Sequence, residues 1–251
     1  MVIRFTHLDK EYWTDLSKGI DISIPLVDNA SGPKCFYAPD FRVEAVRAGD
    51  FIGSTDEGSP VNFKNLFVNP HGNGTHTECA GHITSKPLTI NQCLKTFHFV
   101  ARLITVEPKL MPDLDRIITD DALTKLGDFG GAQALVVRTL PNGDDKLTKD
   151  YSGSNPVYFS EDTILFLNNN GIKHLLTDLP SIDKEVDGGQ LAGHKAFWGF
   201  PDISGWDKTI TEMVYIPSAI RDGLYFCNIQ IASIESDASP SKVVLYPMKA
   251  D

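Results

Sequence analysis

The chain has 251 residues, 41% hydrophobic and 22% charged, which is enough to bury the core of one ordinary globular domain over residues 1–251. Its 33 acidic and 23 basic residues give a formal net charge of −10, and an acidic surface repels phosphate, so we expect no nucleic-acid partner. No apolar run approaches the ~18 residues that span a bilayer. The segment 1–16 carries no signal-peptide core, so we expect a cytoplasmic protein with no membrane partner.

The predicted elements describe a mixed α/β chain. The first third is rich in Gly, Pro, Asn and Asp between short apolar pieces, which is typical of short strands and long loops. β-branched and aromatic residues then favour strands at 97–107 and 134–140. Later segments alternate. They comprise helices at 119–125, 161–169 and 189–200, strands at 172–177, 212–216 and 224–235, and a turn at 237–240.

Four cysteines, Cys35, Cys79, Cys93 and Cys227, are widely spaced and form no C-x-x-C motif. In a chain of this length that spacing is typical of reduced thiols rather than of a disulfide framework. No G-x-S-x-G elbow and no phosphate-binding glycine loop is present, so neither acyl-serine chemistry nor a nucleotide fold is indicated.

The segment 69–82 reads NPHGNGTHTECAGH and holds three of the seven histidines, His71, His76 and His82. Imidazole and carboxylate groups are strong ligands for zinc and related ions. If 75–79 is extended, His76 and Glu78 point to the same face because side chains alternate along a strand. The residues alone indicate a metal site whose other ligands are unidentified. A polar loop with hydrogen-bonded histidines is the alternative.

This segment resembles the signature H-x-G-T-H-x-D-x-P-x-H of the metal-dependent cyclase family, which includes bacterial kynurenine formamidase. The matching positions are Gly74, Thr75, His76 and His82. Glu78 stands in place of the family's Asp and Ala80 in place of its Pro, and His71 precedes His76 by five residues instead of four.

Further similarities extend from about residue 21 to residue 240. The segment 21–26 is similar to the family's D-x-S-x-P-L opening, and 178–183 is similar to its D-x-P-S-x-D stretch. His194 follows in a helix-like segment, and Glu212 resembles the glutamate that opens a late strand in the family.

The resemblance implies an α/β fold with a mixed, partly barrel-like β-sheet and helices packed outside it. It also implies one or two divalent ions, Zn²⁺ or Mn²⁺, per chain. The implied metal ligands are His71, His76, Glu78, His194 and Glu212. His82 matches the family's general acid/base, a role that imidazole suits because its pKa lies near neutrality. Members of the family are commonly oligomeric, so the resemblance is compatible with a homo-oligomer.

The function implied is a metal-dependent hydrolase of an amide or cyclic amide bond in a small molecule. The leading substrate is N-formylkynurenine, hydrolysed to kynurenine and formate. A lactam, lactone or isatin-type ring hydrolase of the same family is one alternative, and a non-catalytic metal- or metabolite-binding protein is another. Phe36, Tyr37 and Trp198 are candidate contacts for an aromatic substrate, although aromatic residues at this density are also typical of a core.

Overall fold

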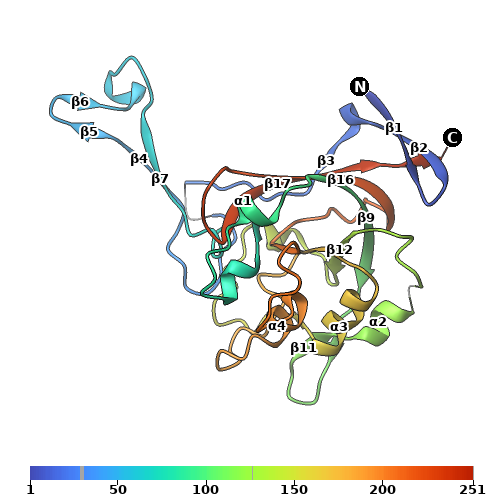
Figure 1. Ribbon diagram of the computed structural model, residues 1–251. Helices are drawn as coiled ribbons and strands as arrows, with labels where there is room; N and C mark the ends of the chain where they lie inside the picture. The colour runs from blue at the N-terminus through green and yellow to red at the C-terminus, as the bar shows by residue number, and fades with distance from the viewer. Residues whose placement is uncertain (29–30, 126, 251) are drawn as a thin grey trace.

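The computed structural model describes residues 1–28, 31–125 and 127–250, and its centre is a closed β-barrel of seven strands (Figure 1). Neighbours follow the order β16-β9-β12-β14-β15-β8-β17, and β17 pairs back with β16 to close the barrel. The barrel strands are β8 (His76–Glu78), β9 (His98–Val106), β12 (Ala134–Thr139), β14 (His174–Thr177), β15 (Thr209–Glu212), β16 (Gly223–Ile231) and β17 (Ala238–Pro247). β3 (Ile20–Asp21) extends the sheet beyond β17.

The barrel is mixed in strand direction. β9, β12, β14 and β15 pair in parallel, whereas β8, β16 and β17 make antiparallel pairs with their neighbours. Parallel neighbours need crossover connections, and these carry three of the four helices, α2, α3 and α4, whereas α1 lies between β8 and β9. The α-helices are α1 (Ile90–Cys93), α2 (Asp120–Thr124), α3 (Glu161–Asn169) and α4 (Ala192–Trp198). The expected mixed, barrel-like α/β fold is confirmed.

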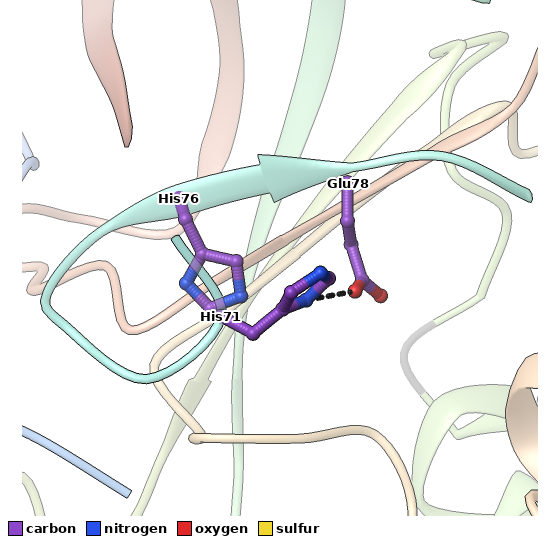
Figure 2. A group of neighbouring side chains, drawn as sticks. All are labelled: His71, His76 and Glu78. Carbon is purple, nitrogen blue, oxygen red and sulfur yellow. Dashed lines mark ion pairs between the residues drawn. The ribbon is translucent and has the colours of Figure 1, made fainter. Parts of the chain in front are cut away.

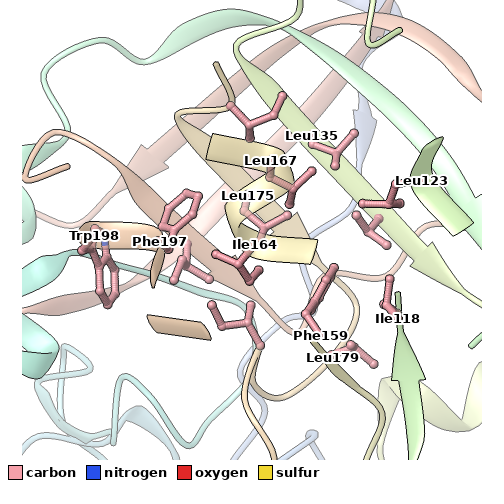
Figure 3. Close-up of a cluster of buried hydrophobic side chains, with 14 of the residues drawn as sticks. Ile118, Leu123, Leu135, Phe159, Ile164, Leu167, Leu175, Leu179, Phe197 and Trp198 are labelled. Carbon is pink, nitrogen blue, oxygen red and sulfur yellow. The ribbon is translucent and has the colours of Figure 1, made fainter. Parts of the chain in front are cut away.

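Side chains alternate between the inner and outer faces of the barrel strands and so form two separate hydrophobic cores. Ala134 and Val136 of β12 belong to the cluster that fills the barrel, which also contains Cys227 of β16. Leu135 and Val137 belong to the other cluster, which packs between the barrel and helices α2, α3 and α4 (Figure 3). The continuous apolar run in β12 is therefore that of a strand buried on both faces.

Several predicted elements are confirmed with small shifts. The strands expected at 97–107 and 134–140 are β9 and β12, and the helix expected at 161–169 is α3. The Ser160 hydroxyl accepts a hydrogen bond from the Thr163 amide at 3.2 Å and so caps α3. The segment expected to be helical at 189–200 forms α4 over a shorter range.

Two expectations at the C-terminal end are wrong. The strand expected at 212–216 ends at Glu212, because Met213 adopts a positive φ of 51° and turns the chain out of the sheet. Of the turn expected at 237–240, only Asp237 lies in a bend, and the other three residues begin β17, where Ala238 pairs with Glu78 and Pro240 with His76. Pairing with β8 outweighs the local turn preference of Asp, Ser and Pro.

Smaller groups of strands lie outside the barrel. A ribbon of β4 and β7, with β5 and β6 at its tip, projects from the body, and a hairpin of β1 and β2 pairs with β18 near the chain ends (Figure 1). These strands are β1 (Val2–His7), β2 (Lys10–Asp15), β4 (Arg42–Ala45), β5 (Arg47–Ala48), β6 (Phe51–Ile52), β7 (Lys64–Phe67) and β18 (Lys249–Ala250).

Another small sheet is formed by β10 (Lys109–Leu110), β11 (Arg116–Ile118) and β13 (Tyr158–Phe159). Short 3-10 helices lie at Leu16–Lys18, Thr55–Glu57, Ala80–Ile83 and Asp144–Leu147. Within the described ranges, no helix combines the length and hydropathy needed to cross a membrane.

Candidate metal centre

The candidate site lies on the outer face of the barrel, where β8 and β15 run side by side. His76 and Glu78 are two residues apart on β8 and share a face, as expected for an extended segment. The register pairs Glu212 of β15 with His76, which brings the second carboxylate to the same face. On the opposite face the Thr77 and Thr211 hydroxyls meet at 2.8 Å.

Glu78 is the centre of the cluster. Its Oε2 lies 3.0 Å from Nδ1 of His71, and its Oε1 lies 3.0 Å from Nε2 of His194 on α4. Figure 2 shows His76 and Glu78 projecting from the same strand, with the His71 ring turned back to meet the carboxylate. The longer spacing between His71 and His76 therefore does not remove His71 from the group.

A fixed oxygen atom orients each of these imidazoles. Nδ1 of His76 lies 3.1 Å from the Gly74 carbonyl, and Nδ1 of His194 lies 2.6 Å from Oδ2 of Asp183. Nε2 of His71 lies 2.8 Å from Oδ2 of Asp237. Because an oxygen acceptor holds a proton on one ring nitrogen, the other nitrogen is the one that would give up any proton to bind a metal cation.

The strongest sign of a missing partner is Nε2 of His76. This atom is buried and has no hydrogen-bond partner among the described residues, although Oε2 of Glu212 is 3.3 Å away. The other oxygen of Glu212 accepts a hydrogen bond from the Ile182 amide at 3.0 Å, which holds the side chain in place. A buried imidazole nitrogen next to a carboxylate oxygen fits the donor set of a divalent cation.

The electrostatics of the cluster also favour bound positive charge. Burial raises the pKa of Glu78, but the neighbouring His82 and His194 outweigh it and hold that pKa well below its usual range. Burial lowers the pKa of His71, but hydrogen bonds to Asp237 and Glu78 raise it to about 10. Carboxylates that hold protons on adjacent imidazoles also create a strong field for a metal cation.

The ligand atoms are close enough to share an ion. Those of His71, His76 and Glu78 all lie within 4.8 Å of one another, and so do those of Glu78, His82 and His194 and those of His71, His82 and Asp237. Glu78 belongs to two of these three groups, so the arrangement is compatible with one ion or with more than one.

His82 lies at the rim of the cluster, with 30% of its side chain exposed. Its Nε2 is 3.9 Å from Oε2 of Glu78, its Nδ1 is 3.4 Å from Oδ2 of Asp237, and its ring stacks on that of His71 at 4.1 Å. His76 and His194 are buried beneath it. This position suits a group that exchanges protons with a bound molecule.

An open groove of about 690 Å³ leads to this rim. His71 and Asp237 line it, together with residues at the base of the β4–β7 ribbon. Its other lining residues are Pro39, Asp40, Arg42, Leu66, Phe67, Val68, Asn69, Pro70 and Ser236.

None of the three aromatic residues expected to contact substrate lines this groove. Phe36 and Tyr37 are exposed, and the Tyr37 amide is hydrogen-bonded to the Ser152 hydroxyl. Trp198 is fully buried, with its ring 5.5 Å from that of His194. It packs behind the histidine and does not face the groove.

Sequence reasoning found the histidines and glutamates but not the role of Asp237. Asp237 was expected only as part of a turn, and it lies far from His71 along the chain. Asp183, in the segment similar to the family's D-x-P-S-x-D stretch, has its Oδ2 2.6 Å from Nδ1 of His194. Cys79 points away from Glu78 and joins the cluster inside the barrel, because side chains alternate along an extended segment.

Comparison with known proteins agrees with this architecture. Residues 14–184 match the model of the cyclase family, described as "Putative cyclase". The chain belongs to the cyclase family. No curated protein matches it significantly.

Solved structures of similar fold include a potential metal-dependent hydrolase with cyclase activity, with TM-score 0.64 and 16% identity over 91% of this chain and 97% of that one. A predicted metal-dependent hydrolase from Bacillus stearothermophilus has TM-score 0.62 and 17% identity, over 91% and 98% of the two chains. Isatin hydrolase A from Labrenzia aggregata has TM-score 0.65 and 15% identity, over 91% and 93%. At these identities the similarity establishes the shared fold.

Proposed function

We propose that this cyclase-family chain is a metal-dependent hydrolase that cleaves an amide or cyclic amide bond in a small molecule. The observation that carries the proposal is the buried Nε2 of His76, which has no hydrogen-bond partner among the described residues and lies 3.3 Å from Oε2 of Glu212. Histidine and carboxylate donors that are themselves oriented by other oxygens are typical of a catalytic metal site.

The ion or ions would be held by five residues. These are His71, His76, Glu78, His194 and Glu212. When bound, a divalent ion such as Zn²⁺ or Mn²⁺ supplies Lewis acidity that polarises a carbonyl group and acidifies water.

The acid/base work falls to His82. Its Nε2 faces Glu78 at 3.9 Å, a distance that leaves this nitrogen unengaged, and its partly exposed ring faces solvent. It can take a proton from water that attacks the substrate carbonyl and deliver that proton to the departing nitrogen. Asp183 and Asp237 keep His194 and His71 in fixed orientations while this occurs.

The leading substrate is N-formylkynurenine, an aryl formamide. An isatin-type ring is the second candidate, because solved structures of similar fold include isatin hydrolases. In both compounds a flat aromatic ring carries the amide nitrogen. Leu66, Phe67 and Pro70 in the groove, beside the guanidinium of Arg42, suit a molecule of that shape.

The test combines metal analysis with turnover of both substrates. We expect about one or two equivalents of metal per chain in the dialysed protein and hydrolysis of at least one substrate. His82→Ala should retain the metal and lose about 100- to 10,000-fold in turnover. His76→Ala should lose the metal itself, and His98→Ala, which alters an exposed histidine on β9, serves as the control.

Full metal occupancy in His76→Ala would contradict the ligand assignment. Loss of metal in His82→Ala would make His82 a ligand instead of an acid/base. Stoichiometric metal with no hydrolysis of any amide or lactam would favour a binding protein.

A further inference from the structure

The carboxylate of Asp237 contacts two histidines of the candidate centre with a single oxygen atom. Its Oδ2 lies 2.8 Å from Nε2 of His71 and 3.4 Å from Nδ1 of His82. Its other oxygen, Oδ1, accepts a hydrogen bond from the Ser236 hydroxyl at 3.0 Å. Asp237 is not among the ligands that the family resemblance implies.

The backbone around Asp237 is held rigidly against the site. Its carbonyl accepts a hydrogen bond from the Cys79 amide at 2.9 Å, and the next residue, Ala238, pairs with Glu78. The segment that carries His82 passes directly beside it, because a Cβ on Gly81 would lie 2.1 Å from the Leu88 carbonyl oxygen and 3.2 Å from Cβ of Asp237. Glycine at position 81 therefore permits the close approach of His82 to Asp237.

The orientation of His82 follows from these contacts. Nδ1 lies on the side of the carboxylate of Asp237, which favours Nδ1 as the protonated nitrogen of the neutral ring, while Nε2 faces Glu78. The His71 ring, stacked at 4.1 Å, blocks one face of the imidazole and limits its rotation.

We propose that Asp237 is the positioning residue that holds His82 in the tautomer and orientation needed for proton transfer, while the same oxygen orients His71 toward the metal. This inference rests on the proposed function for its catalytic consequence. The orientation of His82 can be measured without turnover. Asp237 thereby couples the proton-transfer group to the metal site.

Asp237→Asn is the informative change because it keeps the size of the side chain and removes the carboxylate. In the Zn²⁺-loaded protein, ¹⁵N-histidine NMR should show His82 with its proton on Nδ1, the His82 signals being assigned from their absence in His82→Ala. Asp237→Asn should shift His82 toward the other tautomer with zinc still bound at saturating concentration. The zinc affinity should fall about 10- to 100-fold, because a partner of the ligand His71 has changed.

Turnover provides the second readout. Asp237→Asn should lower kcat about 30- to 1,000-fold with little change in KM, and it should have no further effect on kcat in a His82→Ala background. Asp183→Asn is the matched control, because Asp183 contacts His194 but no contact with His82 is found among the described residues. Its effect should multiply with that of His82→Ala, and it should leave the His82 tautomer unchanged.

An unchanged His82 tautomer in Asp237→Asn would overturn the proposal, as would a multiplicative effect on kcat with His82→Ala. Loss of one equivalent of zinc at saturation would also overturn it, by showing that His71, His82 and Asp237 are themselves a metal site. If the NMR result holds but no amide or lactam is hydrolysed, the proposed function fails and the positioning role stands.

Discussion

At the scale of single residues, buried polar groups of this chain depend on partners that are distant in sequence. Asp178 is fully buried at the end of β14, and its Oδ2 lies 2.7 Å from Nζ of Lys146. Both of its oxygens also accept hydrogen bonds from Thr139. Burial raises the pKa of Asp178, and the charge of Lys146 opposes that rise.

Lys146→Met should destabilise the protein by about 3–5 kcal/mol at pH 8, because it leaves a buried carboxylate without its countercharge. The folded-state pKa of Asp178 then rises further above its unfolded value, so the lost stability should be partly regained as the pH falls toward 5. Chemical denaturation across this pH range measures the effect. The double variant with Asp178→Asn should be less destabilised than Lys146→Met, and equal destabilisation would argue against the pair.

His174 predicts a second pH dependence. Burial, aided by the adjacent Lys173, lowers its pKa to about 4, while its ring stacks on Phe99 at 4.1 Å. An unfolded histidine titrates near 6.5, so the unfolded state takes up the proton first, and stability falls as the pH decreases from about 6.5 to about 4. At pH 4.5 this loss is about 2–3 kcal/mol.

His174→Gln should therefore flatten the pH dependence of stability over this interval relative to the natural chain. The free energy of unfolding at pH 7 and at pH 4.5 is the quantity to compare. His98→Gln, at an exposed position, is the control for the substitution itself. If the unfolding free energy of His174→Gln depends on pH as steeply as that of the natural chain, the loss of stability at low pH is due to carboxylates and not to His174.

At the scale of elements, a residue that is favourable as an N-cap makes the capping hydrogen bond at one helix and does not make it at another. Ser160 caps α3 through the Thr163 amide, whereas the Thr119 side chain makes no capping hydrogen bond at α2. Both residues are favourable at this position by type. Only the structure distinguishes them.

Ser160→Ala should cost about 1 kcal/mol of unfolding free energy, because an amide of the first turn loses its acceptor. Thr119→Ala should cost less than half as much. Thermal or urea unfolding of both variants provides the comparison. Equal losses would mean that the hydroxyl of Ser160 contributes nothing beyond the ordinary effect of substitution.

At the scale of the whole molecule, the candidate centre joins segments that the chain order separates widely. β8 supplies His76 and Glu78, α4 supplies His194 and β15 supplies Glu212. An ion bound there would link the barrel wall to the helical layer. Because the unfolded chain lacks the assembled site, metal binding should stabilise the fold.

Saturating Zn²⁺ or Mn²⁺, at about 100 times its Kd, should add about 2.7 kcal/mol and raise the thermal midpoint by about 5–10 °C over the chelator-treated protein. Differential scanning calorimetry measures the shift. His76→Ala should abolish it and His98→Ala should preserve it. A shift retained in His76→Ala would place the metal elsewhere.

The sequence alone predicted the periodic elements and the cluster of candidate site residues around His76. The apolar runs of β9 and β12, the range of α3 and the His-Glu spacing on β8 are local patterns, because a strand or helix is defined by neighbours a few residues apart. The resemblance then added His194 and Glu212, which no local spacing connects to His76.

Only the tertiary structure decided how the distant parts meet. Closure of the barrel by β16 and β17, the start of β17 in a segment with turn composition, and the sharing of Asp237 by His71 and His82 all depend on pairing across long sequence separations. Such contacts form when the whole chain folds and buries its two cores. The local sequence around each contacting residue therefore does not predict its partner.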